Sequence, residues 1–286
     1  MGNSRRVARE HLMRLANDSA KKSRTGRMLT DAGAFWRLSP KKLDRLLALT
    51  HRADSVELKF VVPVAAHDST CTALGVDLAR ASGRRVYFLD TADCALERHG
   101  VVARVRSIDN KPDDSVIKLR PMAPRDLPAR SPRSKRLFVE VDAMPGRFVC
   151  TGAMRQRLGK RDVERTMTEG RPLRTLFSKQ QLSLLAAHAP GKVGVDDLTV
   201  FGPVDVRRAK IVPGGLDRVL TVERWTYPDG SSILELSTRC AAGAAVPVTA
   251  RVAAVLRDHQ IDVTGFQQTK TRTTLAYFRC AQRADR

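Results

Sequence analysis

Apolar and charged residues alternate over residues 55–62, which is the pattern of a β-strand with two different faces. Val56, Leu58 and Phe60 stand at even positions, and Glu57 and Lys59 stand between them. Because residues two apart on a strand share a face, the segment has an apolar side and a charged side. An acid and a base aligned on one face of such an apolar strand indicate a specific role for that face.

The same spacing of two recurs in five further segments, most of them rich in β-forming residues. The six pairs are Glu57 and Lys59, Arg104 and Arg106, Lys118 and Arg120, Glu140 and Asp142, Glu235 and Ser237 followed by Arg239, and Lys270 and Arg272. If these strands close into one barrel with the charged faces inward, the charges converge on a site for a charged ligand. The alternation alone also permits the opposite arrangement, in which the apolar faces fill the barrel.

The remaining segments complete an α+β pattern. Apolar residues at helical spacing predict helices over residues 68–82, 173–187 and 245–259, and Ser39 followed by Pro40 predicts the start of a short helix. Strands are predicted over 85–89, 204–212 and 216–227, and Tyr-Pro-Asp-Gly at 227–230 predicts a hairpin turn. Residues 121–136 predict a loop, residues 146–200 have the least clear pattern, and residues 266–277 are expected to end the chain partly as strand.

The charge of the chain narrows the choice of ligand. Lys and Arg number 51 against 30 Asp and Glu, which gives a net charge of +21 and a pI near 10.7. Such an excess favours partners rich in phosphate, such as nucleotides, polyphosphate or nucleic acid, and a solvated cationic surface is the alternative. The basic segment over residues 1–34 is either a solvated arm or a contact for RNA or polyphosphate. Aromatic residues make up 5% of the chain, which disfavours sequence-specific RNA binding by stacking.

The cysteines and the apolar runs of the sequence predict where in the cell the protein is found. The 5 cysteines are scattered and form no Cys-x-x-Cys pair, so they predict neither a zinc ribbon nor a redox motif. Reduced thiols in the cytoplasm are the simplest interpretation. No apolar run approaches the roughly 20 residues that a membrane helix needs, so we expect no membrane partner.

Carboxylates among the bases indicate a divalent cation. A surface that binds only anions has no need of Glu57, Glu140, Glu223 and Glu235. Mg²⁺ and Mn²⁺, in contrast, prefer oxygen ligands and bridge phosphate oxygens. In that arrangement the bases hold the phosphates, the acids hold the metal, and the metal polarises one phosphoryl group.

Three motifs together resemble a known family. Glu57 and Lys59, then Tyr-Phe-Leu-Asp-Thr at 87–91 and Val-Ala-Arg-Val-Arg at 102–106, are similar to the CYTH superfamily, the triphosphate tunnel metalloenzymes. The resemblance runs from about residue 54 to about residue 274. It implies an α+β fold over residues 54–286, an eight-stranded antiparallel β-barrel or tunnel with helices packed outside. Residues 1–53 are then a basic N-terminal extension with a short helix.

The resemblance also implies roles for individual residues. Phosphate contacts are expected from Lys59, Arg104, Arg106, Lys118, Arg120, Lys210 and Lys270, with Arg208 as the alternative to Lys210. Glu57, Glu235 and Glu223 are expected to hold Mg²⁺ or Mn²⁺, and Glu140 and Lys59 are expected to be catalytic. The implied activity is metal-dependent hydrolysis of tripolyphosphate or a nucleoside triphosphate.

Two positions depart from the family pattern. The first acid of the opening E-x-E-x-K motif is Ser55 here, and the second acid of the late E-x-E motif is Ser237. A serine offers only a neutral oxygen, so metal affinity falls with the loss of ligand charge. The alternative to an active hydrolase is therefore a catalytically weak module that binds polyphosphate or RNA.

Overall fold

The computed structural model describes residues 53–122, 137–191 and 193–284, together with residues 37, 39, 41, 42, 46, 48 and 49. The basic segment over residues 1–34 lies outside the described residues. Most of the loop predicted over 121–136 and most of the short helix predicted at Ser39 and Pro40 also lie outside them. The boundary between an N-terminal extension and a tunnel domain near residue 53 stays a prediction.

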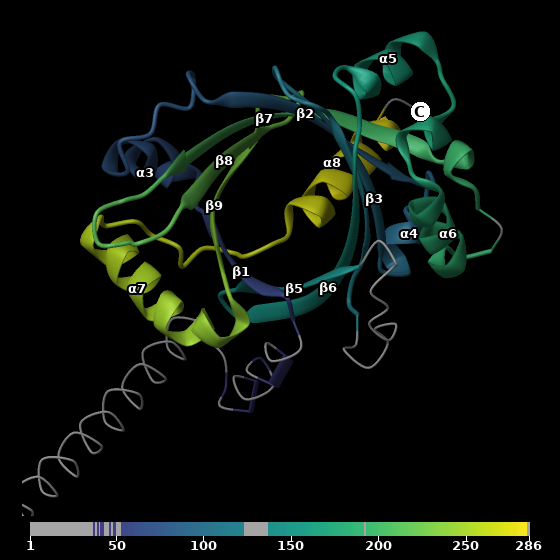
Figure 1. Ribbon diagram of the computed structural model, residues 1–286. Helices are drawn as coiled ribbons and strands as arrows, with labels where there is room; N and C mark the ends of the chain where they lie inside the picture. The colour runs from purple at the N-terminus through teal and green to yellow at the C-terminus, as the bar shows by residue number, and fades with distance from the viewer. Residues whose placement is uncertain are drawn as a thin grey trace, which may run out of the picture.

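Nine strands in the described part of the chain form one closed barrel (Figure 1). The strands are β1 (Ser55–Val62), β2 (Ser82–Asp90), β3 (Val101–Ile108), β4 (Asp114–Leu119), β5 (Phe138–Met144), β6 (Arg147–Arg157), β7 (Thr199–Ile211), β8 (Leu220–Thr226) and β9 (Ser232–Cys240). Around the barrel they follow the order β1-β5-β6-β4-β3-β2-β7-β8-β9, and β9 pairs with β1 to close it.

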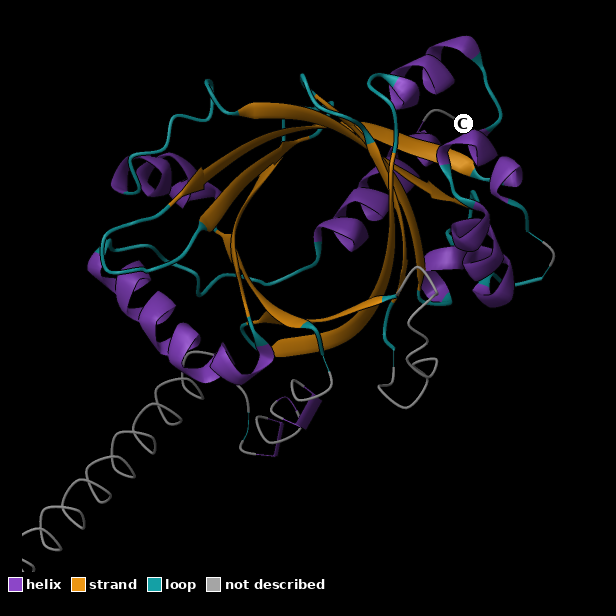
Figure 2. Ribbon diagram, in the orientation of Figure 1, coloured by secondary structure: helices purple, strands orange, loops and turns teal. Residues whose placement is uncertain are grey.

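Most of the helices cover the barrel from outside (Figure 2). On one side lie α3 (His67–Ala73) and α7 (Ala245–Asp258), and against the wall that contains β3 lie α4 (Ala95–Arg98), α5 (Asp162–Glu169) and α6 (Lys179–His188). The last helix, α8 (Lys270–Ala284), is seen through the barrel opening, inside the ring of strands. Short 3-10 helices stand at Val64–Ala66, Leu173–Leu176, Val195–Asp197 and Ala242–Ala244. None of the described helices has the length and hydropathy needed to span a lipid bilayer.

The strands turn their apolar faces outward to the helices and their charged faces inward. Leu58 and Phe60 of β1 are fully buried in a hydrophobic cluster with Val252 of α7. Glu57 and Lys59, on the opposite face of the same strand, line the barrel interior. Of the two arrangements that the alternation permits, the structure therefore has the one with an interior of charged side chains.

Two further hydrophobic clusters pack against the remaining strands of the barrel. One lies outside the wall, where Val105 of β3 and Ile117 of β4 pack with Val163 of α5 and Leu185 of α6. The other lies where α8 enters the barrel and joins Val86, Phe88, Val206, Trp225, Tyr227 and Leu275. The barrel is thus apolar outside, polar along part of its interior, and filled by α8 along the remainder.

The expected eight antiparallel strands are wrong in number and in direction, although the α+β barrel with outer helices is confirmed. β5 pairs with β1 in parallel, Ser55 opposite Glu140 and Leu58 opposite Ala143. The ninth strand is β6, which lies in the region without a clear pattern. Its alternation is obscured because Gly152 stands on the outer face, where a side chain would meet Leu137. β4 pairs with β6 rather than with β5, so the connection from β4 to β5 is not a hairpin.

The strand expected within residues 266–277 is also wrong, because this segment begins α8. The four threonines of residues 266–277 favour a strand by propensity, but Thr274, Leu275 and Phe278 recur at helical spacing and pack into the barrel. Tertiary packing of that stripe overrides the local propensity. Lys270 and Arg272 therefore lie on a helix and do not share a face as a strand pair would.

Other boundaries shift for local reasons. The helix predicted over 68–82 ends at Ala73, since Gly75 adopts a left-handed conformation with φ +61°. The helix predicted over 173–187 begins at Lys179, where Ser178 and Gln181 form a capping box. The strand predicted over 216–227 begins at Leu220.

Candidate functional site

Two adjoining cavities occupy the barrel interior. The main cavity has a volume of about 470 Å³ and the side cavity about 50 Å³. Five residues line both, namely Lys59, Arg104, Lys118, Glu235 and Lys270. Eleven Lys and Arg side chains line the two cavities, against four carboxylates. The interior is therefore strongly cationic with a minority of acids.

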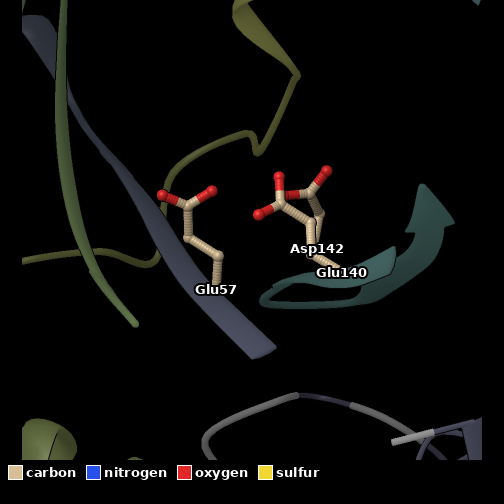
Figure 3. Close-up of side chains that lie close together, drawn as sticks. All are labelled: Glu57, Glu140 and Asp142. Atoms are coloured by element: carbon tan, nitrogen blue, oxygen red, sulfur yellow. The ribbon is translucent and has the colours of Figure 1, made fainter. Parts of the chain in front are cut away.

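Three acids meet where β1 and β5 run side by side. Glu57 of β1 stands directly opposite Asp142 of β5, and Glu140 shares the inner face with Asp142. One carboxylate oxygen from each of the three lies within 4.8 Å of the other two, and Figure 3 shows the three groups gathered in one place. We call Glu57, Glu140 and Asp142 the three-acid cluster. It exists because β5 pairs with β1 in parallel, in a register that sets these positions together.

Two lysines hold the three-acid cluster from within the barrel. Lys59 Nζ lies 2.6 Å from Asp142 Oδ1 and 3.0 Å from Glu57 Oε2. Lys118 Nζ lies 3.3 Å from Glu140 Oε1. Each cluster acid therefore already has an ammonium partner, and both lysines also reach the main cavity.

Two arginines complete the surroundings of the cluster. Arg239 of β9 places a guanidinium nitrogen 2.8 Å from Glu140 Oε2 and 3.5 Å from Glu57 Oε2. Arg120 forms an ion pair with Asp142, and its Nε donates to Thr151 Oγ1 at 3.1 Å. Four bases thus surround three acids, and the cluster carries a net positive charge with its partners.

The buried charges of the cluster perturb one another. Burial by itself raises the pKa of Glu57, but the charges of Lys59 and Arg239 outweigh it and leave that pKa well below its ordinary value. Burial likewise opposes ionisation of Glu140, and Lys118 in turn lowers the pKa of that carboxyl. Burial holds the pKa of Lys118 well below its ordinary value, against the attraction of Glu140. Glu57 and Glu140 are therefore ionised at neutral pH, and a further anion near Lys118 would stabilise its charge.

A second acid pair lies on β8 and β9, on the side of β1 that faces away from β5. Glu223 and Glu235 stand directly opposite each other in the antiparallel register, and we call them the Glu223–Glu235 pair. Lys270, the first residue of α8, reaches both, at 2.5 Å from Glu223 Oε2 and 2.7 Å from Glu235 Oε1. Arg208 Nε lies 3.2 Å from Glu223 Oε1, and Trp225 Nε1 donates to Glu223 Oε2 at 3.1 Å.

Arg104 is a half-buried base of the interior, whereas Arg155 and Lys210, which also line the main cavity, are exposed. It lines both cavities, and it forms no ion pair with any acid in the described part of the chain. Burial, reinforced by the neighbouring charge of Arg106, lowers the pKa of Arg104 to about 9. Arg106 is compensated, since its Nε donates to Asp114 Oδ1 at 2.7 Å. Arg104 therefore carries an uncompensated charge toward the cavities.

The structure brings the sequence-predicted residues together, although not in the predicted groups. All seven expected phosphate contacts line the cavities, namely Lys59, Arg104, Arg106, Lys118, Arg120, Lys210 and Lys270. Of the three expected metal ligands, Glu57 belongs to the three-acid cluster, whereas Glu223 and Glu235 lie together around Lys270. Their roles in binding or catalysis stay predictions.

Several residues around the two cavities had no role predicted from the sequence. Asp142 and Arg239 belong to the charged pairs, but only the parallel register of β1 and β5 and the closure by β9 bring them to Glu57. Arg147 and Arg155 line the cavities from β6, the strand that the pattern did not predict. Spacing within one strand could not reveal these contacts, because they join strands far apart in the chain.

Two solved structures share this architecture. A candidate adenylate cyclase from Bacillus halodurans superposes with a TM-score of 0.53 at 15% sequence identity, over 77% of this chain and 97% of its own. A candidate adenylyl cyclase from Hippeastrum, described as having a dominant triphosphatase activity, gives a TM-score of 0.52 at 15% identity, over 74% of this chain and 91% of its own. No protein-family model matches the sequence, and no curated protein does so either. The likeness concerns the fold, and at that level it confirms the resemblance to CYTH-type tunnel proteins.

Proposed function

We propose that the barrel interior binds a triphosphate-containing compound, either tripolyphosphate or a nucleoside triphosphate, and hydrolyses it with the help of Mg²⁺ or Mn²⁺. The observation that carries the proposal is the excess of eleven bases over four acids around a cavity of about 470 Å³. A cavity of this size accommodates a small ligand, and a polyanion is the ligand that such a charge balance favours. The triphosphatase activity described for the Hippeastrum neighbour gives further support.

The three-acid cluster fits a hard divalent cation. Its three carboxylates supply the oxygen ligands that Mg²⁺ and Mn²⁺ prefer. Ser55, opposite Glu140 in the register, is 5% exposed, and its Oγ has no hydrogen-bond partner in the described structure. Glu57, Glu140 and Asp142 would hold the ion, with Ser55 as a neutral fourth oxygen. A bound ion would supply charge neutralisation and would polarise a phosphoryl oxygen.

The bases of the cluster gain new partners when a phosphate chain enters. Lys59, Lys118 and Arg239 now pair with carboxylates, and each can turn its donors to phosphate oxygens in the adjoining cavity. Lys59 reaches both cavities and is suited to neutralise charge that builds up on the transferred phosphoryl group. The lowered pKa of Glu140 makes it a weak proton acceptor, so its proposed part is to hold the ion and orient the attacking water.

Phosphate release tests this proposal directly. We expect turnover of tripolyphosphate or ATP with Mg²⁺ or Mn²⁺, and we expect Lys59→Met to lower kcat by at least about a hundredfold, because a charge that stabilises the transition state is removed. The matched control is Lys111→Met, which removes an exposed lysine in the turn between β3 and β4 and should leave turnover unchanged. If folded natural protein releases no phosphate with any divalent metal, the proposed hydrolase activity is contradicted.

The second candidate function is a binding module with little catalysis. The observation that favours it is that every acid of the three-acid cluster already has a basic partner, so a divalent ion has to compete with four bases. In that case calorimetry shows tripolyphosphate binding, and the same sample releases no phosphate.

An RNA contact would rest on residues 1–34, outside the described structure, and gains no support from the barrel. We place either function in the cytoplasm, in keeping with the free thiols that are buried in the described part of the chain, Cys71, Cys94, Cys150 and Cys240.

A further inference from the structure

The Glu223–Glu235 pair requires a cation between its two members. The two glutamates stand directly opposite each other on antiparallel strands, and both side chains are largely buried. Like charges in this cross-strand position destabilise a sheet, and burial increases the cost. The pair therefore persists in ionised form only with a positive charge close to both carboxylates.

Lys270 supplies that charge from the protein itself. Its Nζ lies within 2.7 Å of an oxygen from each glutamate, and its side chain is 14% exposed. The ammonium also stands 4.8 Å from the centre of the Trp225 ring, which adds a favourable cation–π contact. Burial opposes ionisation of Glu223, but Lys270 overcomes it and holds the pKa of that carboxyl well below its ordinary value.

The helix behind Lys270 is anchored, which fixes the point from which the Lys270 side chain extends. In the following turns Thr274 Oγ1 lies 3.1 Å from Tyr227 Oη, Leu275 is buried, and Tyr277 stacks on Tyr227 with ring centres 4.8 Å apart. Tyr277 Oη also accepts from the backbone N–H of Asp229 at 3.1 Å. These contacts position the first residue of α8 over the Glu223–Glu235 pair.

We propose that Lys270 is a tethered counter-ion that keeps divalent cations off the Glu223–Glu235 pair, so that the barrel holds its divalent ion at the three-acid cluster alone. A metal ion and an ammonium cannot both occupy the space between the two carboxylates. The part of this inference that concerns the three-acid cluster rests on the proposed function, and the part that concerns Lys270 stands on its own contacts. It assigns Glu223 and Glu235 to an internal ion pair in place of the metal role expected from the sequence.

The number of Mn²⁺ ions bound per chain tests the inference, measured by calorimetry and by the electron paramagnetic resonance signal of free Mn²⁺. We expect one site in the natural protein and an additional site in Lys270→Met, which keeps the length of the side chain and removes its charge. Lys270→Arg keeps a cation at the same position and should bind the same number of ions as the natural protein. Adding Glu223→Gln to Lys270→Met should remove the additional site. An unchanged stoichiometry in folded Lys270→Met overturns the inference.

A second measurement needs no change at Lys270. Because Glu235 takes no part in binding the divalent ion, Glu235→Gln should leave Mn²⁺ affinity and stoichiometry unaltered, whereas Glu140→Gln should abolish the site. Loss of the Mn²⁺ site in Glu235→Gln overturns the inference even if Lys270→Met fails to fold. If the natural protein binds no Mn²⁺ but Lys270→Met binds one, the tethered counter-ion is upheld and the metal site of the proposed function is refuted.

Discussion

Arg104 is a cavity-lining base without an ion pair among the described residues. Its guanidinium is buried and lacks an acidic partner in the described part of the chain, whereas Arg106 on the same strand face is paired with Asp114. A ligand phosphate would supply the missing partner. Two neighbouring arginines of one strand therefore differ, because only Arg106 is paired with an acid of the protein.

Arg104→Met should weaken tripolyphosphate binding by about tenfold or more, since a charge-assisted hydrogen bond contributes about 1.5–3 kcal/mol. It should leave the free energy of unfolding unchanged or slightly higher, because a desolvated and unpaired cation is removed. Calorimetry and urea denaturation measure the two effects. Arg106→Met is the matched comparison, and it should lower stability by about 1–3 kcal/mol by leaving Asp114 without its partner. Equal binding by natural protein and Arg104→Met would show that the ligand lies elsewhere.

His67 gives a pH dependence that can be separated from that of the acids. The imidazole is buried, with Nε2 3.2 Å from the carbonyl oxygen of Val62 and 3.3 Å from the backbone nitrogen of Leu234. Burial lowers its pKa below the ordinary value of 6.5. The hydrogen bond to Val62 and the charge of Asp68 act against that shift, and Arg224 reinforces it. The unfolded chain therefore takes up a proton at a higher pH than the folded chain does.

Stability from neutral His67 is fully present above about pH 6.5 and should decline as the pH falls below that value, because protonation then favours the unfolded chain. His67→Gln keeps hydrogen-bonding capacity without titrating, so the decline between about pH 6.5 and about pH 5 should flatten. Urea denaturation across this range measures it. The depressed carboxylates Glu57 and Glu223 lose their stabilising ion pairs only at pH values below the ordinary 4.5 of a glutamate, so they leave this window clear. A parallel decline in both proteins would assign the effect to other groups.

At the scale of elements, the strands differ in how well the sequence predicts them. β1 is recovered within its predicted bounds, and β3 contains the predicted Arg104 and Arg106 pair, because the central residues of each strand alternate apolar and charged side chains and one face meets helices. β6 escapes prediction because Gly152 interrupts its outer face, and α8 is mistaken for strand because its threonines favour one. The inward direction of the charged faces and the parallel seam of β1 and β5 depend on closure by β9. Contacts between strands that are far apart in the chain cannot be predicted from the local pattern of apolar and charged residues.

The residues of the candidate site also divide into those that a local pattern predicts and those that depend on contacts between distant strands. Lys59, Arg104 and Lys118 were predictable as members of charged strand faces, because spacing within one strand sets which side chains share a face. The grouping of the acids was not, since it depends on which strand lies beside β1. A hairpin partner would have placed other residues next to Glu57, and the three-acid cluster exists only because β5 returns to β1 in parallel.

α8 is the element that couples stability to the site. Leu275 packs with Trp225 and Phe88 inside the barrel, and the same helix carries Lys270. Leu275→Ala should lower the free energy of unfolding by about 2–5 kcal/mol through the cavity it leaves. Denaturation by urea provides the measurement, and Phe266→Ala, at a side chain that is 83% exposed, should change stability by less than about 0.5 kcal/mol. If Leu275→Ala also changes the free energy of unfolding by less than about 0.5 kcal/mol, α8 is only loosely packed against the barrel.

At the scale of the whole molecule, the net charge of +21 acts differently inside and outside the barrel. Charges at the surface are screened by salt within about 8–10 Å at physiological ionic strength, whereas buried charges are screened much less. Lys59 and Lys118 are mostly buried, and their partners Asp142 and Glu140 are more so. A ligand inside the barrel and a polyanion on the surface should therefore respond differently to added salt.

Tripolyphosphate affinity should fall by less than about tenfold between about 50 mM and about 200 mM salt if the ligand binds inside the barrel. An RNA held by exposed bases should lose about a thousandfold over the same range. Calorimetry with tripolyphosphate and fluorescence anisotropy with a labelled single strand make the comparison on one preparation. A steep loss for tripolyphosphate would place its binding on the outer surface.

The placement of the large hydrophobic clusters outside the barrel wall bears on how such a chain can diverge. Most small domains keep their folding energy in the centre, so a change at the centre endangers the fold. Here Leu58 and Val105 face outward into two of the clusters, while Lys59 and Arg104 face inward from the same strands. Successive generations can therefore exchange inner residues, and with them the preferred ligand, while the outward residues keep the chain folded. An architecture shared with another solved structure at 15% identity fits this separation of inner and outer residues.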